Sequence, residues 1–553
     1  MKNEKLALLG DEAVALGAIH AGISAAYGYP GTPSTEILQY LINESARNGI
    51  AARWCSNEKT AMEAALGVSF AGRRVIVTMK HVGLNVAADP FINAALLKIK
   101  GGLVIAVADD PGMHSSQNEQ DSRFYADFAM VPCLEPRSQQ EAYDMVREAF
   151  NVSERFNIPV LLRIVTRLAH ARAAVTPKPA EPQNKVSKTQ EKKSWMLLPV
   201  FARKNYETLL EKQKILNEWS NQHPVNKITA SKGRQSLSED MSSNGSLAII
   251  TSGLGGNYYE ENLEEFLALQ KKQGNSVPAH LHIGAYPLPE KKIRMLCNEA
   301  DEILVIEEGQ PFIANKIFGI TGSSVKEIIQ TGELTPDNVR IVLGLPPRKG
   351  VNAKIDPDTL PARPPQLCQG CPHTDSYNAL NKAVAALDPK PGHPDVGINS
   401  DIGCYSLGAS PPLSAIESIV CMGACVGMAK GAADAGLKYS IAVIGDSTFI
   451  HSGITPLIDA VDSDTTMTLI ILDNSSVAMT GCQPTIVPSE KLKNLIIGCG
   501  VKPSRILELE AKANLLEENA AKLKAEIEEE GLSVVIFKRV CLESFRKNKK
   551  ENF

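Results

Sequence analysis

The alternation of apolar and polar positions is clearest between Tyr439 and Asn474, where it predicts one complete strand–helix–strand unit. One apolar run ends at Gly445-Asp446, and a second ends at Asp473-Asn474. Between them, apolar residues at 454, 457, 458 and 461 recur with the spacing of one helix face. The two strands are expected to be parallel and joined by a right-handed crossover, because the helix returns the chain to the same end of the sheet.

The same alternation runs through most of the chain and predicts an α/β fold of parallel sheets flanked by helices. In residues 1–172, short β-rich runs lie between helical patterns, and we expect strands at Ala25–Tyr29, Val75–Met79, Leu103–Ala108 and Val160–Val165.

Two further units follow, 247–347 and 367–543. The first carries strand patterns at 280–285 and 302–308, and the second contains the strand–helix–strand unit. Residues 173–246 are expected to form a surface linker with one helical piece, because 175–194 are rich in proline, lysine and glutamine and a second polar stretch follows the helical pattern. The charged stretch from Arg505 to Glu530 is expected to be one long amphipathic helix packed on the surface.

Composition changes this picture little. The chain has 553 residues, enough for about three or four domains, with 44% hydrophobic and 22% charged residues and a net charge of −4. Nothing in this balance indicates a nucleic-acid partner. The N-terminus does not resemble a signal peptide, and no run of about 18 apolar residues predicts a membrane span. We therefore expect a cytoplasmic protein whose 11 cysteines are mostly thiols or metal ligands.

The two strand ends of the 439–474 unit form the first candidate site. Parallel pairing would bring Asp446 and Asn474 together at the edge of the sheet where ligands bind in open α/β folds. One carboxylate, one amide oxygen and free carbonyl groups suit a Mg²⁺ that also carries phosphates. A capping aspartate in an ordinary turn is the alternative, but two such motifs across one unit favour a metal–diphosphate site.

The N-terminal unit offers two weaker candidates. A Pro-Gly turn at 27–36 presents the Thr32 hydroxyl where a strand ends, although the turn is equally suited to helix capping alone. Glu58 begins a helix rich in small residues, and there it can simply favour the positive end of the helix dipole. Taken alone, that second interpretation of Glu58 is the better one.

Four cysteines form a third candidate site. Cys368 and Cys371 make a C-x-x-C pair, and Cys404 and Cys541 follow two expected strands of the same unit. A single pair is compatible with a redox dithiol, half a zinc site or part of an iron–sulfur site. Because zinc ribbons more typically carry two such pairs, one pair with two distant cysteines favours iron–sulfur.

Together these motifs resemble the thiamine-diphosphate-dependent 2-oxoacid:ferredoxin oxidoreductases, and most of all the alpha (large) subunits of the indolepyruvate branch. The resemblance is carried by YPGTPSTEI at 29–37, NEKTAMEAALG at 57–67, MKHVGLNVAADP at 79–90, DDPGMHSSQNEQDSR at 109–123, CQGCPH at 368–373, SDIGCYSLG at 400–408, MGACVGMAKG at 422–431, GDSTFIHSGI at 445–454 and LDNSSVAMTGCQ at 472–483.

The resemblance implies a domain plan and a set of cofactors. Residues 1–172 would be a pyrimidine-binding domain and 367–543 a diphosphate-binding and magnesium-binding domain, both with the thiamine-diphosphate-binding fold. Residues 247–347 would be a transketolase-C-terminal-like domain that packs and does not catalyse. The cofactors would be thiamine diphosphate, Mg²⁺ and one 4Fe–4S cluster.

The resemblance also implies residue roles. Glu58 would bind the pyrimidine nitrogen, which reverses the interpretation above, while Thr32 and Arg123 would hold the oxoacid. Mg²⁺ would be bound by Asp446, Asn474 and the Ser476 carbonyl. The cluster would be bound by Cys368, Cys371, Cys404 and Cys541. The remaining cofactor contacts would come from Gly403, Gly423, Gly445 and Ser447.

The implied reaction is oxidative decarboxylation of an aryl 2-oxoacid such as indolepyruvate, with coenzyme A taking the acyl group and ferredoxin the electrons. A non-oxidative thiamine decarboxylase or ligase is the alternative, since it would share Glu58 and the metal motif without needing the cysteines. A scaffold subunit that has lost catalysis would be expected to lack Glu58, Asp446 or Asn474, and all three are present.

The chain departs from the family pattern in two ways. Most alpha subunits of this type continue into a ferredoxin-like domain with two C-x-x-C-x-x-C-x-x-x-C-P runs, and the sequence has no such run after Cys541. The family also needs a small beta subunit that resembles a gamma domain, and no pattern in this sequence supplies its equivalent. We therefore expect a hetero-oligomer, two large and two small subunits, with a shorter electron relay.

Overall fold

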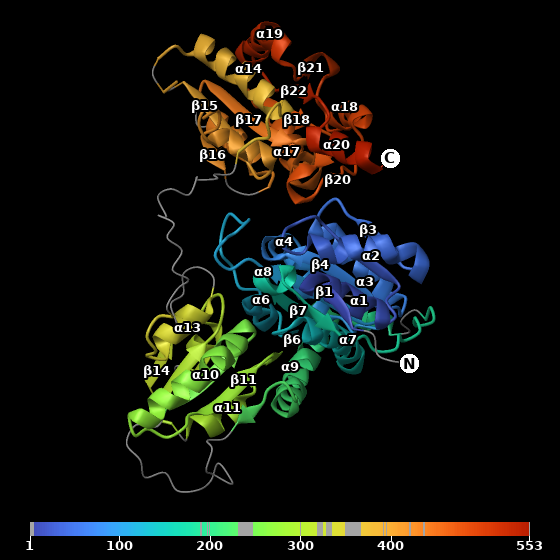
Figure 1. Cartoon of the computed structure of the whole chain (residues 1–553). Coiled ribbons are helices and arrows are strands. Elements are labelled where there is room, and N and C mark those ends of the chain that lie inside the picture. Colours follow the sequence, from blue (N-terminus) through green and yellow to red (C-terminus); the bar gives the residue numbers. More distant parts are fainter. Residues whose placement is uncertain are drawn as a thin grey trace. The chain divides into compact units, whose positions relative to one another are not determined.

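A computed structural model describes most of the chain, which falls into two compact units, Met1–Ala353 and Lys354–Phe553 (Figure 1). The described residues are 5–187, 191–195, 197, 199–229, 247–298, 300–317, 324–327, 334–348, 366–390, 392–393, 395–419, 422–434 and 437–551.

The first unit contains a seven-stranded sheet in the order β12-β6-β7-β5-β4-β2-β3. All its ladders are parallel except the one between β12 and β6, and the four strands predicted in 1–172 are confirmed within a residue or two. The strands are β2 (Ala25–Gly28), β3 (Ala51–Trp54), β4 (Val75–Lys80), β5 (Leu103–Asp109), β6 (Cys133–Leu134), β7 (Val160–Val165) and β12 (Ala285–Tyr286).

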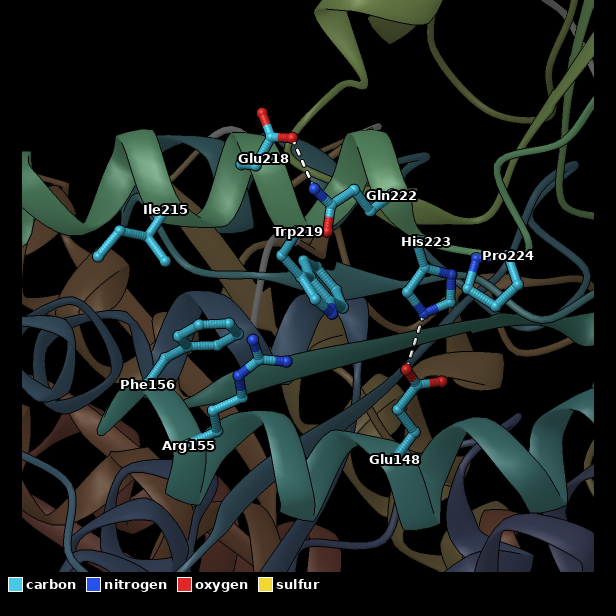
Figure 2. A pocket seen from close by; sticks show the side chains of 9 residues that line it. All are labelled: Glu148, Arg155, Phe156, Ile215, Glu218, Trp219, Gln222, His223 and Pro224. Atoms are coloured by element: carbon cyan, nitrogen blue, oxygen red, sulfur yellow. Dashed lines mark hydrogen bonds and ion pairs between the residues drawn. The ribbon is translucent and has the colours of Figure 1, made fainter.

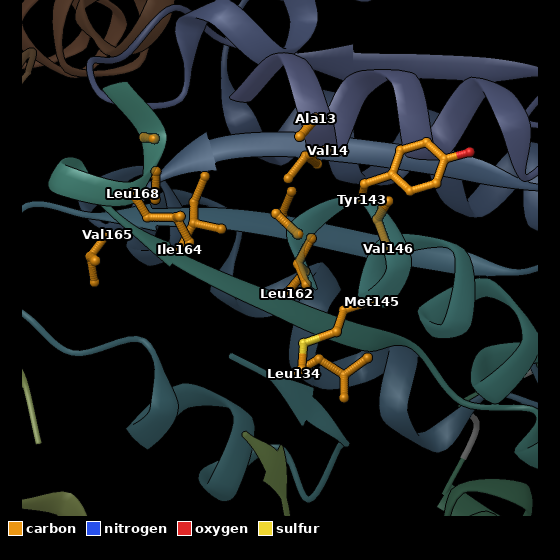
Figure 3. Close-up of a cluster of buried hydrophobic side chains, with 14 of the residues drawn as sticks. Ala13, Val14, Leu134, Tyr143, Met145, Val146, Leu162, Ile164, Val165 and Leu168 are labelled. Atoms are coloured by element: carbon orange, nitrogen blue, oxygen red, sulfur yellow. The ribbon is translucent and has the colours of Figure 1, made fainter. Parts of the chain in front are cut away.

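Helices cover this sheet, and α1 packs against α7 (Figure 3). A Cβ added at Gly17 would lie 2.4 Å from a Val146 methyl, so the glycine permits the close approach. Ala13, Val14, Tyr143 and Val146 are fully buried there, as expected for apolar and aromatic residues in a packed core. The helices are α1 (Gly10–His20), α2 (Thr35–Asn48), α3 (Glu58–Phe70), α4 (His81–Val86), α5 (Ala88–Leu96), α6 (Arg123–Phe128), α7 (Gln139–Phe156) and α8 (Thr166–His170).

The segment after β7 is held against the same domain. β8 (Arg172–Val175) pairs antiparallel with β1 (Leu6–Leu9), and Glu181 forms an ion pair with Arg74 at 2.8 Å. The first part of the predicted surface linker therefore packs along the surface of the domain. The helical piece predicted within it is α9 (Pro199–Gln222), and residues 230–246 lie outside the described part of the chain.

A five-stranded sheet completes the first unit, in the order β14-β13-β10-β11-β9, with parallel ladders except between β11 and β9. The strand patterns at 280–285 and 302–308 correspond to β11 and β13. The elements are β9 (Ile228–Thr229), β10 (Leu247–Ser252), α10 (Leu254–Lys272), β11 (Ala279–Ile283), α11 (Glu290–Cys297), β13 (Glu302–Ile306), α12 (Phe312–Ile317), β14 (Ser324–Glu327) and α13 (Pro336–Val342).

The second unit is built on a six-stranded, all-parallel sheet in the order β16-β15-β17-β18-β22-β21. The predicted strand–helix–strand unit is confirmed as neighbouring β17 and β18 with α17 between them. The elements are α14 (Pro372–Leu387), β15 (Val396–Ser400), β16 (Ser418–Ile419), α15 (Ala424–Asp434), β17 (Tyr439–Gly445), α16 (Asp446–Thr448), α17 (Ile454–Asp462), β18 (Thr468–Asp473), α18 (Ser489–Gly498), β21 (Ile506–Glu510), α19 (Leu516–Glu528), β22 (Ser533–Lys538) and α20 (Leu542–Glu551).

The long helix predicted from Arg505 to Glu530 is wrong in its first part. Residues 506–510 form the edge strand β21, and the helix begins only at Leu516. The local pattern of ILELE fits a helix or a strand. β22 offers an open edge for strand pairing, and Lys538 on β22 forms an ion pair with Glu508. Tertiary pairing thus overrides the charged helical pattern.

Two features bear on the expected class of protein. The α/β fold class with parallel sheets and flanking helices is confirmed. Within the described part of the chain, no helix has both the length and the apolar character needed to cross a membrane.

Candidate functional site

In the second unit, two strand ends meet as the sequence predicts. Asp446 follows β17 directly and Asn474 follows β18 directly, on neighbouring parallel strands. The Asp446 carboxylate accepts backbone N–H bonds from Ser447 and from Ser475, both at 2.8 Å. The turn after β18 is therefore folded onto the Asp446 carboxylate.

The electrostatics of this corner favour a bound cation. Burial raises the pKa of Asp446 well above its usual range, and the nearby carboxylate of Asp473 raises it further. A buried pair of carboxylates is costly without a positive charge beside it. Asn474 Oδ1 accepts from the Ser476 N–H at 2.9 Å, so the amide oxygen is held in this corner as well. This oxygen-rich donor set fits a Mg²⁺ ion.

A histidine that the sequence analysis left without a role fixes the Asn474 side chain. Asn474 Nδ2 lies 3.1 Å from His373 Nε2, and burial lowers the pKa of His373 to about 4. The imidazole is therefore neutral at pH 7 and accepts from the amide N–H, which orients the amide oxygen away from the histidine. The signal was present in the sequence, because His373 lies two residues after the second cysteine of the C-x-x-C pair.

The four candidate cysteines gather beside this corner. The Cys541 N–H donates to the Asn474 carbonyl at 3.1 Å, and the Cys371 N–H donates to the Cys368 carbonyl at 3.0 Å. Burial and, after it, the charges of Cys371, Cys541, Cys368 and Cys482 together raise the pKa of Cys404 to about 12. A buried thiol whose ionisation is disfavoured in this way fits a site that is stable once a metal centre binds it as a thiolate.

Two of the three candidate glycines of this unit, Gly403 and Gly445, lie against Tyr405, and Gly423 lies against Ser452. A Cβ at Gly403 or Gly445 would lie 2.3 Å or 2.5 Å from the Tyr405 ring. Gly423 has a φ of +84° and donates its N–H to Asp401 Oδ2 at 3.0 Å. Glycine is thus required at Gly423 for the left-handed turn, and at the other two positions for space.

In the first unit, Glu58 begins α3 and is buried. Asn57 caps the helix by accepting the Thr60 N–H at 2.8 Å, so Glu58 is not needed as the cap. A Cβ at Gly83 would lie 2.4 Å from Glu58 Oε1, which places the carboxylate directly against α4. The absence of a side chain at Gly83 makes room for the carboxylate.

The turn that carries Thr32 lies beside a buried lysine. Ser115 Oγ donates to the Thr32 carbonyl at 3.1 Å, and Lys80 Nζ donates to the Ser115 carbonyl at 2.7 Å. Burial lowers the pKa of Lys80 to about 8. Lys80 ends β4 and His81 follows it, so both belong to the same sheet edge as Thr32, and the sequence analysis assigned no role to either.

Comparisons with known proteins agree with this arrangement. Residues 16–241 match the family model described as "Pyruvate flavodoxin/ferredoxin oxidoreductase, thiamine diP-bdg", and 401–537 match the model of the C-terminal thiamine pyrophosphate-binding domain of thiamine enzymes. The indolepyruvate oxidoreductase subunit IorA of Archaeoglobus fulgidus is 35% identical over 98% of this chain and 87% of its own length. The chain belongs to the IorA family of 2-oxoacid oxidoreductase subunits.

More distant relatives extend the same picture. IorA of Pyrococcus horikoshii is 32% identical over 97% of this chain and 86% of its own length. A solved 2-oxoglutarate:ferredoxin oxidoreductase from Magnetococcus marinus has a TM-score of 0.50 at 15% identity, and the match covers 62% of this chain and 65% of that chain. This last likeness supports the fold alone.

In this IorA-family chain, Arg123 does not lie in an open site, and the predicted role for it needs correction. Its guanidinium is 1% exposed and pairs with Asp121 and, at 2.9 Å, with Glu307. It also donates to the Glu308 and Gln310 carbonyls at 3.2 and 3.1 Å. With its N–H groups so engaged, Arg123 ties the two sheets of the first unit together and is not available to a substrate carboxylate.

A surface hollow lies between α7 and α9 of the first unit (Figure 2). Its volume is about 300 Å³, and a His223–Glu148 hydrogen bond of 2.8 Å lies on its wall. None of the predicted site residues of this IorA-family chain is among those that line it: Glu148, Arg155, Phe156, Ile215, Glu218, Trp219, Gln222, His223 and Pro224.

Proposed function

We propose that this chain is the catalytic subunit that oxidatively decarboxylates an aryl 2-oxoacid with coenzyme A, passing the electrons through one 4Fe–4S cluster to ferredoxin. The observation that carries the proposal is the contact between two sites. His373 and Cys541 link the cysteine group to Asn474 of the candidate magnesium corner, at 3.1 Å in each case. A decarboxylation site joined to four thiols suits chemistry that must remove electrons as well as carbon dioxide.

Thiamine diphosphate, when bound, supplies the sink for the electron pair that the departing carboxylate leaves behind. In this proposal Asp446, Asn474 and the Ser476 carbonyl hold the Mg²⁺ that carries the diphosphate. Glu58 exchanges a proton with the pyrimidine ring nitrogen. Thr32 and Lys80 are linked through Ser115, and both are candidates to hold the oxoacid, with Lys80 taking the place that Arg123 cannot fill.

The spacing of the cysteines supports an iron–sulfur cluster over zinc. Four thiolates around one zinc ion would have sulfur atoms about 3.8 Å apart, because Zn–S bonds are about 2.3 Å long. In the part of the chain that the structure describes, no three of these sulfur atoms lie within 4.8 Å of one another. A larger cluster spans such a group more readily.

The proposed reaction balances: the 2-oxoacid and coenzyme A give acyl-CoA, carbon dioxide, one proton and two electrons.

The proposal includes partners and a domain plan. Residues 1–172 and 367–543 would bind the two ends of the cofactor and 247–347 would pack, in an assembly of two such chains with two small beta subunits. Ferredoxin would accept the electrons. The family membership supports a multi-subunit enzyme, and the aryl substrate rests on the names of the relatives.

Rates with a panel of 2-oxoacids, with coenzyme A and a viologen dye as acceptor, test the proposed reaction. We expect aryl pyruvates to have the highest kcat/KM and dye reduction to depend on coenzyme A. Product formation without dye reduction would favour the non-oxidative decarboxylase or ligase. A preference for 2-oxoglutarate or pyruvate would overturn the substrate class but not the reaction.

Because Glu58 lies in the first unit and Asp446 in the second, co-expression of two inactive variants tests how the site is shared. If one cofactor is bound by two copies of the chain, mixed dimers of Glu58→Gln and Asp446→Asn regain one intact site, and random mixing gives about a quarter of wild-type activity. If each chain builds its own site, the mixture stays inactive.

Replacing Gly83 by alanine is expected to reduce activity without touching a charged group. The new Cβ would lie 2.4 Å from Glu58 Oε1, so the carboxylate must shift. A shift of about 1 Å can lower a rate about 10²-fold. The measurement is kcat with the best 2-oxoacid. Gly67→Ala is the matched control, because a Cβ on that residue of α3 meets nothing within 4 Å, and its activity should be that of the wild type.

Replacing Asp446 by asparagine is expected to have opposite effects on activity and on stability. Activity should be lost, since the variant lacks the charge that holds Mg²⁺. The metal-free protein should become more stable, because the raised pKa of Asp446 means that its ionised form is disfavoured in the folded state at neutral pH.

The increase in the melting temperature of the metal-free protein should be about 2–6 °C, for about 1–2 kcal/mol in a unit of this size. It should shrink as the pH falls toward 4, where the wild-type carboxyl becomes protonated in both the folded and unfolded states. Asp459→Asn on the exposed side of α17 is the control, with no change in either quantity. A less stable metal-free Asp446→Asn would contradict the cation-site interpretation.

A further inference from the structure

A second group of ligand-type side chains lies in the first unit, apart from the candidate magnesium corner and the cysteines. It consists of Asp11 on α1, Glu36 on α2 and His170 at the end of α8. One ligand atom from each lies within 4.8 Å of the others. No role in the proposed reaction uses any of the three.

Asp11 is the unusual member of the group. Its side chain is fully buried, and neither carboxylate oxygen has a hydrogen-bond partner among the described residues. Its neighbour Glu36 offers a second carboxylate, which also only accepts, and Glu36 Oε2 is likewise without a donor within hydrogen-bond distance. The only nearby donor among the described residues is the His170 imidazole, 3.6 Å from Glu36 Oε2, so the two facing carboxylates need a proton or a cation between them.

The other two ligands give the site an open side. His170 Nε2 lies 3.6 Å from Glu36 Oε2, and their side chains are 37% and 42% exposed. The buried Asp11 thus lies at the base of the group, and the histidine and glutamate form a solvent-facing rim. Three protein ligands with a side left for water are typical of an open metal site.

We propose that Asp11, Glu36 and His170 bind a divalent transition-metal ion of the Zn²⁺ or Mn²⁺ class. Two carboxylates and a neutral imidazole balance the charge of such an ion, and the imidazole argues against Mg²⁺ and Ca²⁺, which prefer oxygen. Tetrahedral zinc needs neighbouring ligand atoms about 3.4 Å apart. The two exposed side chains can close the present separation by small rotamer changes.

The position of the group assigns the ion a structural role. Glu36 lies four residues after Thr32, on the helix that follows the turn, and His170 ends the helix that follows β7. An ion bound there joins α1, α2 and α8 at the sheet edge where the candidate substrate residues lie. This site is independent of the proposed function, since it shares no residue with it.

Zinc binding to the assembled, cluster-loaded protein tests the proposal, with Mg²⁺ and thiamine diphosphate in excess so that those sites are filled. We expect one Zn²⁺ per chain with a Kd in the micromolar range or below. X-ray absorption at the zinc edge should give oxygen and nitrogen neighbours at about 2.0–2.2 Å and no sulfur at about 2.3 Å.

Matched variants locate the ion. Asp11→Asn and His170→Asn should each weaken zinc binding at least about tenfold, or about 1.4 kcal/mol. Glu44→Gln removes a carboxylate from the same helix as Glu36 at a position paired with Arg47, and should bind as the wild type does. The zinc-free melting temperature of Asp11→Asn should equal or exceed that of the wild type, which excludes loss of fold as the cause.

Three results would overturn the site. The first is that no zinc binds at about 100 μM, a concentration well above the expected Kd. The second is the presence of sulfur ligands in the X-ray absorption spectrum. The third is an unchanged zinc affinity in a folded Asp11→Asn variant. Each of these results would indicate instead that Asp11 and Glu36 are two carboxyl groups that share a proton.

Discussion

Glu58→Gln is expected to lower the rate of 2-oxoacid-dependent dye reduction by about 10²- to 10⁴-fold, the range for loss of a proton-transfer group. Glutamine keeps the shape of the side chain against Gly83, so the fold and the affinity for thiamine diphosphate should change little. The measurement is kcat together with cofactor affinity, since the proposed role predicts loss of the first and retention of the second.

Glu63→Gln is the matched control for this variant. Glu63 lies on the same helix, is exposed and forms an ion pair with Lys59. Its loss should change activity less than about twofold, since surface ion pairs contribute little. Wild-type turnover in Glu58→Gln would remove Glu58 from the proton-transfer role and would return it to the simpler interpretation, a charge at the start of a helix.

Cys404→Ser is expected to produce the second large effect. Its thiol lies beside those of Cys371, Cys541 and Cys368, so a serine there removes one of four proposed thiolate ligands. We expect loss of most of the bound iron and at least about a hundredfold fall in dye reduction, because ligand loss removes the electron path. Thiamine diphosphate binding should persist, since Asp446 and Asn474 are unchanged.

Cys499→Ser serves as the control for this cysteine. Cys499 follows α18 and is not part of the cysteine group, so its replacement should leave iron content and activity unchanged. If Cys404→Ser retained full iron content and full dye reduction, the four-cysteine assignment would be wrong even if the reaction itself were correctly assigned.

The strands and the candidate magnesium corner could be predicted because their signals are local. A buried parallel strand is a continuous apolar run, and Asp446 and Asn474 each follow such a run directly. Parallel pairing of neighbouring strands then brings the two residues together without further information. The stretch at 506–510 was predicted wrongly because its charged pattern suits a helix and only its pairing with β22 makes it a strand.

The burial of Arg123 and Asp11 and the long-range contact of His373 could not be predicted in the same way. Arg123 looked suited to a substrate carboxylate, but its partners Glu307 and Ser252 are more than 120 residues away and belong to the other sheet of the first unit. His373 was visible beside the cysteines, yet its contact with Asn474 spans 101 residues. Asp11 gave no signal at all, because an aspartate in the first turn of a helix is ordinary.

The most direct test of the central claim is an anaerobic measurement on the protein purified with its small subunit. Iron and sulfide per chain are determined on the same sample as the electrons delivered to a viologen dye per carbon dioxide released. The account predicts a brown protein with about four irons and four sulfides per chain and two electrons per carbon dioxide. A colourless, iron-free protein that still releases carbon dioxide from a 2-oxoacid would contradict it.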